Sequence, residues 1–293
     1  EGRRWLAPVA QIRFLYPVRK AQVPAMVDDE QGCLAWRDRE DGAVEVISVS
    51  IVSHAHGAMV EKLIRALLDC PEVRQVILTR NVPEILDIAT DARIVSIDNP
   101  APKGFGANHN AAFALCDQPF FCPVNPDIEL PANPFPELVK SASVSGAAIV
   151  APLVIAPDGK VEDSMRHFPT LRSLTAKALG LGGGRYVVRD GQPDFAPEWV
   201  AGMFMLFRSE AFAELKGFDE KFFLYYEDVD VCIRAWNRGL RVLACPRVSV
   251  IHDARRDSRR SLRHLRWHVA SMGRFFWKHW ARLPKLPESR APA

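Results

Sequence analysis

Two hydrophobic patterns alternate along the first half of the chain. A β-branched run at 44–53 is typical of a buried strand. It leads into a segment whose apolar residues recur with helical spacing, at Val60, Leu63, Ile64, Leu67 and Leu68. Further strands are predicted at 73–79, 92–98, 119–125 and 145–156, with a helix at 106–116. Strands that alternate with helices predict an α/β fold with a mostly parallel, twisted, doubly wound sheet.

The second half of the chain predicts two helices, at 227–238 and 258–282. Gly239 ends the first of them. Residues 1–45 show no clean period and are cut by three prolines, so they are treated as an N-terminal extension. We therefore expect three parts: the extension 1–45, a main domain at 46–252, and a C-terminal helix with its tail at 253–293.

Composition narrows the class of protein. Of the 293 residues, 48% are hydrophobic and 25% charged, as in ordinary soluble globular proteins. No segment approaches the run of about 18 apolar residues that a transmembrane helix needs, and we expect no signal peptide. The six cysteines are scattered without a CxxC pair, which favours reduced thiols and a cytoplasmic setting and argues against zinc.

Two acidic segments are candidates for chemistry. Asp127 follows a predicted buried strand in the sequence Asn-Pro-Asp, where ligands of such a sheet bind. A carboxylate there suits Mg²⁺ or Mn²⁺, which take one or two carboxylates together with substrate phosphate oxygens; an Asx-type turn is the alternative. Glu227, Asp228 and Asp230 open a predicted helix, where they complement its dipole, and Asp230 can pair with Arg234 one turn later.

These segments occur in an order that resembles a known family. The stretch 199–252 reads WVAGMFMLFRSEAFAELKGFDEKFFLYYEDVDVCIRAWNRGLRVLACPRVSVIH. It resembles the inverting family 2 glycosyltransferases with the GT-A fold, a Rossmann-like sheet flanked by helices, and in particular their rhamnosyltransferase-like branch. KGFGANHNAAF at 103–113 resembles the family's Gly-Phe element, and Asn-Pro-Asp stands in the place of its DXD-type metal motif.

The resemblance implies a role for each matching residue. Asp228 would be the general base that deprotonates an acceptor hydroxyl, and Asp127 with His252 would bind a divalent metal, Mn²⁺ or Mg²⁺, on the donor diphosphate. The implied acceptor side comprises Trp199, Gly202 and Glu227. The implied donor side comprises Ser53, His54, Asn81, Gly104, Phe105, Asn110 and Asp127.

The chain departs from the family where the nucleotide is bound. The first strand ends in Ser53-His54 instead of the usual Asn, and the second in Thr79-Arg80-Asn81 instead of Asp-Asn. The donor is therefore left open among nucleoside-diphosphate sugars, with dTDP-rhamnose as the first hypothesis and UDP- and GDP-sugars as alternatives. The expected function is metal-dependent, inverting sugar transfer to a saccharide or lipid-linked saccharide in bacterial surface polysaccharide synthesis.

The tail carries a charge asymmetry that bears on partners. From Asp253 onward there are 11 Lys and Arg against 3 Asp and Glu, whereas the rest of the chain has 27 against 32. Within 258–282 an apolar stripe runs through Leu262, Leu265, Val269, Met272, Phe276 and Trp280. Such a basic amphipathic helix suits the anionic inner face of a membrane, and packing of the stripe on the domain is the alternative.

Three other classes of protein are weighed against the enzyme. The basic tail also suits nucleic acid, but the acidic body and the lack of a nucleic-acid motif argue against that class, so no nucleic-acid partner is expected. A sugar-nucleotide pyrophosphorylase would carry a Gly-rich N-terminal signature that is missing here. A catalytically inactive GT-A protein that only binds glycans is disfavoured by the intact acidic motifs.

Overall fold

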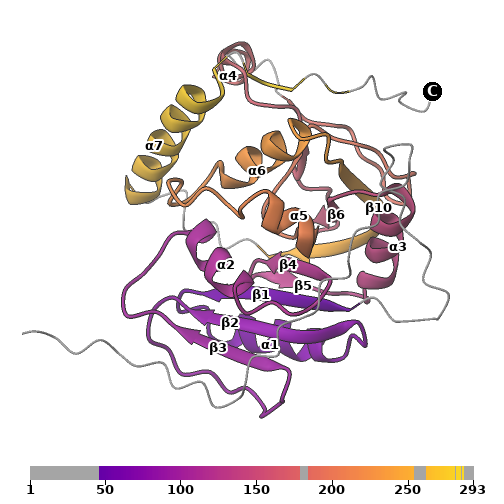
Figure 1. The fold of residues 1–293 in the computed structure, drawn as a ribbon, viewed down its shortest axis with the longest axis vertical. Coiled ribbons are helices and arrows are strands. Elements are labelled where there is room, and N and C mark those ends of the chain that lie inside the picture. The colour runs from indigo at the N-terminus through magenta and orange to yellow at the C-terminus, as the bar shows by residue number, and fades with distance from the viewer. Residues whose placement is uncertain (1–45, 179–183, 254–261, 281, 285, 287–293) are drawn as a thin grey trace, which may run out of the picture. The chain divides into compact units, whose positions relative to one another are not determined.

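The computed structural model describes residues 46–178, 184–253, 262–280, 282–284 and 286. The predicted extension 1–45 lies outside the described residues. Seven helices and ten strands are described (Figure 1). The helices are α1 Ala58–Leu68, α2 Phe105–Phe113, α3 Phe135–Ser145, α4 Leu171–Ala178, α5 Ser209–Glu214, α6 Glu227–Trp236 and α7 Leu262–His279.

An eight-stranded sheet forms the centre of the fold, in the order β3-β2-β1-β4-β9-β6-β10-β5. Its strands are β1 Ile47–Ser53, β2 Val73–Arg80, β3 Ile94–Asp98, β4 Phe120–Val124, β5 Ile128–Glu129, β6 Ile149–Ile155, β9 Leu206–Arg208 and β10 Val242–His252. Four of the seven pairings are parallel: β3 with β2, β2 with β1, β1 with β4, and β6 with β10. The predicted α/β fold with a mostly parallel sheet is confirmed.

The hydrophobic pattern of the sequence did not predict the shortest strands. Strand β9 lies between β4 and β6 and is antiparallel to both, and the two-residue β5 pairs antiparallel with the end of β10. A separate antiparallel pair is formed by β7 Met165–Arg166 and β8 Trp199–Val200. Two or three residues are too few to show a period, so the hydrophobic pattern alone does not reveal these strands.

The sheet buries the apolar positions that defined the predicted elements. Val60, Leu63, Ile64 and Leu67 of α1 are buried against the first strands of the sheet, as their helical spacing predicts. A second apolar cluster on the other side includes Phe207, Phe212 and Phe218 from the segment that leads into α6. Burying one such side chain stabilises a fold by about 1.5–3 kcal/mol relative to leaving it exposed.

Helix α7 packs through a different face from the apolar stripe. Ser271, Phe275 and His279 are its buried residues. Leu262, Leu265, Val269 and Trp280 of the stripe are between 52% and 79% exposed, while Met272 and Phe276 pack partly against the core. The hypothesis that the stripe packs on the domain is therefore wrong for its four exposed members. No helix in the described part of the chain is long and apolar enough to cross a membrane.

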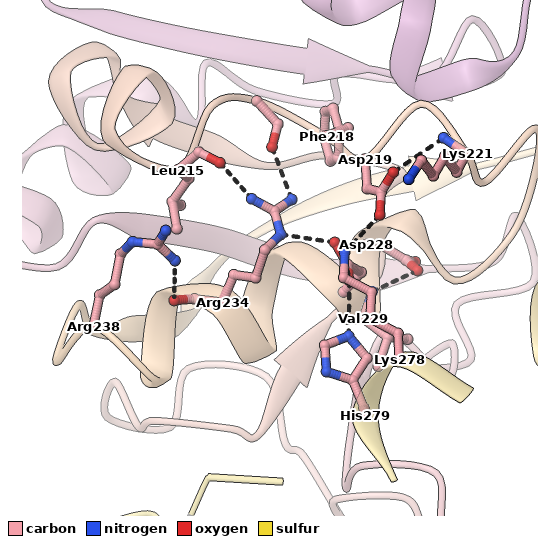
Figure 2. Close-up of polar contacts among 12 residues, drawn as sticks. Leu215, Phe218, Asp219, Lys221, Asp228, Val229, Arg234, Arg238, Lys278 and His279 are labelled. Atoms are coloured by element: carbon pink, nitrogen blue, oxygen red, sulfur yellow. Dashed lines mark hydrogen bonds and ion pairs between the residues drawn. The ribbon is translucent and has the colours of Figure 1, made fainter. Parts of the chain in front are cut away.

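The buried carboxylate of Asp230 joins α6 to α7. Its Oδ2 accepts a hydrogen bond from Arg234 Nε at 2.7 Å, which confirms the predicted pair within α6. Its Oδ1 lies 2.6 Å from Lys278 Nζ and 2.7 Å from His279 Nε2, both on α7. Lys278 also reaches Asp219 Oδ2 at 2.6 Å. Figure 2 shows the side chains of Arg234, Lys278 and His279 converging from the two helices.

The partners of Asp230 lower its pKa. Complete burial by itself would raise the pKa, but the hydrogen bond from His279, the charge of Arg234 and the contact with Lys278 outweigh it and hold the pKa at about 2. The ionised form is therefore favoured in the folded protein relative to the unfolded chain, where an Asp has a pKa of about 3.9. The resulting stabilisation is full well above pH 4 and is lost as the pH falls toward 2.

We expect Asp230→Asn to lower the free energy of unfolding by about 3 kcal/mol at neutral pH, because it leaves the partly buried side chains of Arg234 and Lys278 without their carboxylate. The difference between the variant and the native chain should shrink as the pH falls from 5 toward 2. Urea denaturation across this pH range measures both effects. Glu214→Gln is the matched control: it removes an exposed carboxylate 4.0 Å from Arg238, and such pairs contribute about 0–1 kcal/mol. Equal stability of the two variants would contradict the anchoring role of Asp230.

Candidate active site

Asp228 is held at the start of α6 by backbone donors. Its Oδ2 accepts a hydrogen bond from Gly202 N at 3.0 Å, and its Oδ1 accepts one from Val229 N at 2.8 Å. Gly202 lies two residues after the end of strand β8, so the chain leaving the strand meets the start of the helix at this carboxylate. A Cβ at Gly202 would lie 3.4 Å from Asp228 Cβ and 3.5 Å from Phe105 Cζ. The predicted residues Asp228, Gly202 and Phe105 are thus brought together.

The neighbouring carboxylates Glu227 and Asp228 occupy different environments. Burial raises the pKa of Glu227 well above its usual range, the charge of Asp228 raises it further, and Glu227 Oε2 has no hydrogen-bond partner in the described structure. Burial also raises the pKa of Asp228, but the donors on Gly202 and Val229 and the charge of Arg166 oppose that rise. Asp228 is therefore the member of the pair that ionises first, as a general base requires.

A cavity of about 240 Å³ opens beside Asp228. It is lined by Arg166, His167, Pro169, Ser173, Gly184, Trp199, Tyr225, Tyr226, Glu227, Asp228, Val229 and His268. The predicted acceptor-side residues Trp199 and Glu227 are both in its wall. Arg166 pairs with Trp199 across the β7–β8 ladder, and its guanidinium lies 5.5 Å from the indole centroid. No sequence motif singled out Arg166; its position opposite Trp199 is decided by the pairing of two short strands.

The carboxyl ends of β1 and β2 bring the predicted donor-side residues together. Asn81 N donates to Ser53 O at 2.8 Å, and Asn81 Nδ2 lies 3.4 Å from His54 Nδ1. Asn81 also fixes the next loop, because its side chain accepts from Lys103 N at 2.8 Å and donates to Lys103 O at 2.9 Å. Buried Asn99 donates to Asn81 Oδ1 at 2.9 Å and to Asn108 Oδ1 at 2.6 Å. Sequence reasoning missed Asn99 and Asn108; the polar residue after the third predicted strand was the available signal.

Gly104 and Phe105 connect this loop to the acidic segment. Phe105 N donates to Phe223 O at 2.9 Å. A Cβ at Gly104 would lie only 2.5 Å from the same carbonyl oxygen. The chain therefore requires glycine at 104 for close backbone approach and not for its conformational freedom.

Asn110, in α2, contacts the turn formed by Gly217, Phe218 and Asp219. Its Nδ2 donates to Phe218 O at 2.9 Å and to Glu220 Oε1 at 3.0 Å, and its Oδ1 accepts from Phe218 N at 2.9 Å. The side-chain amide thus holds the turn that precedes α6. Its predicted contact with the donor stays a prediction, and this structural role is the one that its hydrogen bonds support.

Asp127 and His252 form a second acidic site. His252 Nε2 lies 3.2 Å from Asp127 Oδ2, and its Nδ1 lies 2.7 Å from Glu162 Oε2. Burial opposes protonation of the ring, but the hydrogen bonds and charges of Asp127 and Glu162 raise the pKa of His252 to about 8. Asp127 Oδ1 is buried and has no hydrogen-bond partner in the described structure. The strands β5 and β10 place Asp127 and His252 together, because His252 pairs with Ile128.

The donor set at Asp127 fits a metal that takes few protein ligands. The described residues hold no group of three His, Cys, Asp or Glu side chains arranged for a metal ion. One carboxylate with an unsatisfied oxygen and one imidazole leave most positions of a divalent cation to other oxygen ligands, as Mg²⁺ sites commonly do. Glu162 on the far nitrogen of His252 completes the carboxylate–histidine arrangement that orients metal-binding imidazoles.

The chain is similar in sequence to curated sugar transferases, although no protein-family model matches it. It is 28% identical over 243 residues to the rhamnosyltransferase WbbL of Escherichia coli (strain K12), which covers 78% of this chain and 92% of the relative. It is 32% identical over 157 residues to N-acetylglucosaminyl-diphospho-decaprenol L-rhamnosyltransferase of Mycobacterium tuberculosis (strain H37Rv). That alignment covers 50% of this chain and 51% of the relative.

The fold matches those of solved glycosyltransferases. GalNAc-T7, solved with UDP, GalNAc and Mn²⁺, matches 73% of this chain and 45% of its own length, with a TM-score of 0.58 and 14% identity. The mannosyltransferase PcManGT from Pyrobaculum calidifontis, in complex with GDP-Man and Mn²⁺, matches 82% of this chain and 65% of its own length, with a TM-score of 0.54 and 14% identity. At this level of identity the likeness concerns the fold.

The sheet topology, the acidic helix start beside a cavity and the sequence relatives together define a glycosyltransferase with the GT-A fold. Within that class the chain is rhamnosyltransferase-like, because two of its curated relatives are rhamnosyltransferases, and it is a nucleotide-sugar glycosyltransferase of polysaccharide synthesis.

Proposed function

We propose that the chain transfers rhamnose from a nucleoside-diphosphate sugar to a saccharide carried on a lipid diphosphate, with inversion at the anomeric carbon. The observation that carries this proposal is Asp228, an ionisable carboxylate with fixed geometry in the wall of a cavity that also contains Trp199. The names of the relatives, a rhamnosyltransferase and an N-acetylglucosaminyl-diphospho-decaprenol L-rhamnosyltransferase, support the sugar and the kind of acceptor.

The proposed reaction uses Asp228 as the general base. Its carboxylate takes the proton from an acceptor hydroxyl, whose oxygen forms the new bond to the anomeric carbon of the donor. The bond between that carbon and the diphosphate breaks at the same time, and the nucleoside diphosphate leaves with the electron pair. Arg166 favours the ionised form of Asp228 through its charge, and the donors on Gly202 and Val229 keep the carboxylate in one orientation.

Asp127 and His252 would hold a divalent cation, Mn²⁺ or Mg²⁺, and Glu162 would orient His252. When bound, the cation would neutralise the charge that builds on the leaving diphosphate. Ser53, His54 and Asn81, at the ends of β1 and β2, would contact the nucleotide. The buried asparagine cluster would fix the Lys103 backbone beside them.

Asp228→Asn is expected to lower kcat by about 10²–10⁴-fold, the usual contribution of a general base, while donor binding stays nearly unchanged. The assay is transfer from a panel of dTDP-, UDP- and GDP-sugars, with and without Mn²⁺, to a short-chain N-acetylglucosaminyl diphospholipid. The control is Glu210→Gln, an exposed carboxylate on α5. Near-normal turnover by Asp228→Asn would contradict the assignment of Asp228 as the general base. A native chain that binds saccharide but turns over no donor would indicate the inactive glycan-binding alternative.

Asp127→Ala is expected to weaken Mn²⁺-dependent binding of a nucleoside diphosphate by at least about tenfold, since even residues that only orient metal ligands cost 10–100-fold. Isothermal titration with and without Mn²⁺ measures this change. Glu129→Gln is the matched control, because Glu129 lies on β5 but pairs with Lys62 at 2.6 Å. Unchanged affinity in Asp127→Ala would count against the metal site.

We further propose that the chain works at the inner face of the cell membrane through the outer side of α7. Leu265, Val269 and Trp277 are 58%, 52% and 89% exposed, and Arg263, Arg266 and Arg274 on the same helix are also exposed. Exposed aromatic and aliphatic residues among arginines suit an anionic bilayer surface. Each cation near such a surface contributes about 1 kcal/mol, screened by salt.

The double variant Leu265→Gln, Val269→Gln is expected to lose binding to anionic vesicles at low salt while it remains folded, because both side chains point to solvent. Co-sedimentation at low and high salt measures the binding. Val144→Gln, which changes an 84% exposed valine on α3, is the control and should bind like the native chain. If the native chain stays in the supernatant at low salt, the membrane proposal fails.

A further inference from the structure

Helix α7 contributes a wall of the cavity beside Asp228. His268 is the α7 residue that lines this cavity, together with Tyr225 and Tyr226 from the turn before α6. The His268 ring centroid lies 5.4 Å from that of Tyr225 and 5.5 Å from that of Tyr226. The helix that carries the outer apolar stripe thus faces the catalytic carboxylate with its inner side.

A continuous seam holds α7 on the turn that precedes α6. Ser271 Oγ donates to Leu224 O at 2.8 Å, and Tyr225 Oη lies 3.1 Å from His264 Nδ1. Phe223 packs on Trp267 with 4.8 Å between ring centroids. Each turn of the first half of α7 therefore contacts residues 223–226, so the position of His268 is fixed relative to the cavity.

The turn itself needs such support. Tyr225 and Tyr226 both adopt left-handed backbone conformations, with φ of 70° and 69°. This conformation costs roughly 1–2 kcal/mol for each residue that has a side chain. It persists where surrounding contacts determine it, and strain of this kind gathers at functional sites. The seam with α7 supplies those contacts directly before Glu227 and Asp228.

The Asp230 cluster fixes the other end of α7. Asp230 is fully buried, and its two partners from α7 are Lys278 and His279. These contacts lie three turns along α7 from His268, and they attach the helix to α6, which carries Asp228 (Figure 2). Asp228 on α6 and His268 on α7 are therefore held in place by two attachments of α7. One is the seam with residues 223–226, and the other is the Asp230 cluster.

We propose that α7 is part of the acceptor site and that His268 contacts the acceptor saccharide. The chemistry of the wall suits a sugar. The rings of Tyr226 and His268 offer apolar faces to the C–H groups of a pyranose, and imidazole is a polar group that can exchange a hydrogen bond with a sugar hydroxyl. The 240 Å³ cavity is smaller than the sites of about 300–1,000 Å³ that hold drug-sized ligands, so it takes one sugar unit and leaves the rest of the acceptor outside.

This inference rests on the proposed function, because it names a residue for the acceptor of that same reaction. The test is direct binding of a short-chain N-acetylglucosaminyl diphospholipid. Isothermal titration in the presence of nucleoside diphosphate and Mn²⁺ measures this binding. His268→Ala is expected to weaken this binding, and to raise the acceptor KM, by about tenfold, the loss of one good contact. The donor KM and the acceptor-independent hydrolysis of the nucleotide sugar are expected to stay unchanged.

Two further variants separate contact from folding. His268→Gln keeps a side chain that can form a hydrogen bond and is expected to recover part of the affinity. Val144→Ala changes an 84% exposed valine on α3 that does not line the cavity, and is expected to bind the acceptor like the native chain. All variants should show native thermal unfolding, because His268 and Val144 are both exposed.

The outcomes distinguish this inference from the proposed function. Acceptor binding that is equal in His268→Ala and the native chain overturns the role of His268, even when transfer itself is active. Failure of the native chain to bind the probe at all also overturns it. Binding that depends on His268 without turnover of any donor keeps the saccharide site and refutes sugar transfer.

Discussion

A buried negative charge is the constraint on which the arrangement of the active site depends. Asp230 is fully buried, and an ionised carboxylate in such a place is stable only when cations surround it. One of its three basic partners comes from its own helix α6 and two come from α7. Separating α6 from α7 would therefore leave the Asp230 carboxylate without its partners from α7. The seam between α7 and residues 223–226 follows from this attachment.

Three carboxylates within four positions of one helix start have three different fates. Glu227 is buried and has the strongly raised pKa, Asp228 has backbone donors that favour its ionised form, and Asp230 has a pKa held at about 2 by its cations. Helical geometry turns successive side chains by about 100°, so they enter different surroundings. One acidic motif can thus supply a buried wall residue, a candidate base and a structural anchor.

The predicted donor and acceptor sides are connected through backbone contacts. Gly104 and Phe105 approach the Phe223 carbonyl from the donor loop, and Phe223 packs on α7. Phe105 also lies against Gly202, whose amide holds Asp228. Asn110 and the buried asparagines Asn81, Asn99 and Asn108 serve the same end, because their amides fix turns and loops. Many of the polar side chains in this region therefore hold backbone segments in place.

The sequence by itself determined the class of fold and most of the residues that meet at the site. Long β-branched runs and one amphipathic helix predicted the parallel strands and α1, and ordered motifs pointed to Asp127, Asp228, Trp199, Gly202 and His252. Only the tertiary structure decided which face of α7 packs, where β9 and the β7–β8 pair lie, and that Arg166, Glu162, Asn99, Asn108 and His268 lie beside the predicted site residues. Those features depend on pairing of two- or three-residue strands and on contacts between residues far apart in the chain. A local hydrophobic period carries no information about strand pairing or about long-range contacts. A charged residue or a histidine can be buried only where the rest of the fold places a suitable partner beside it.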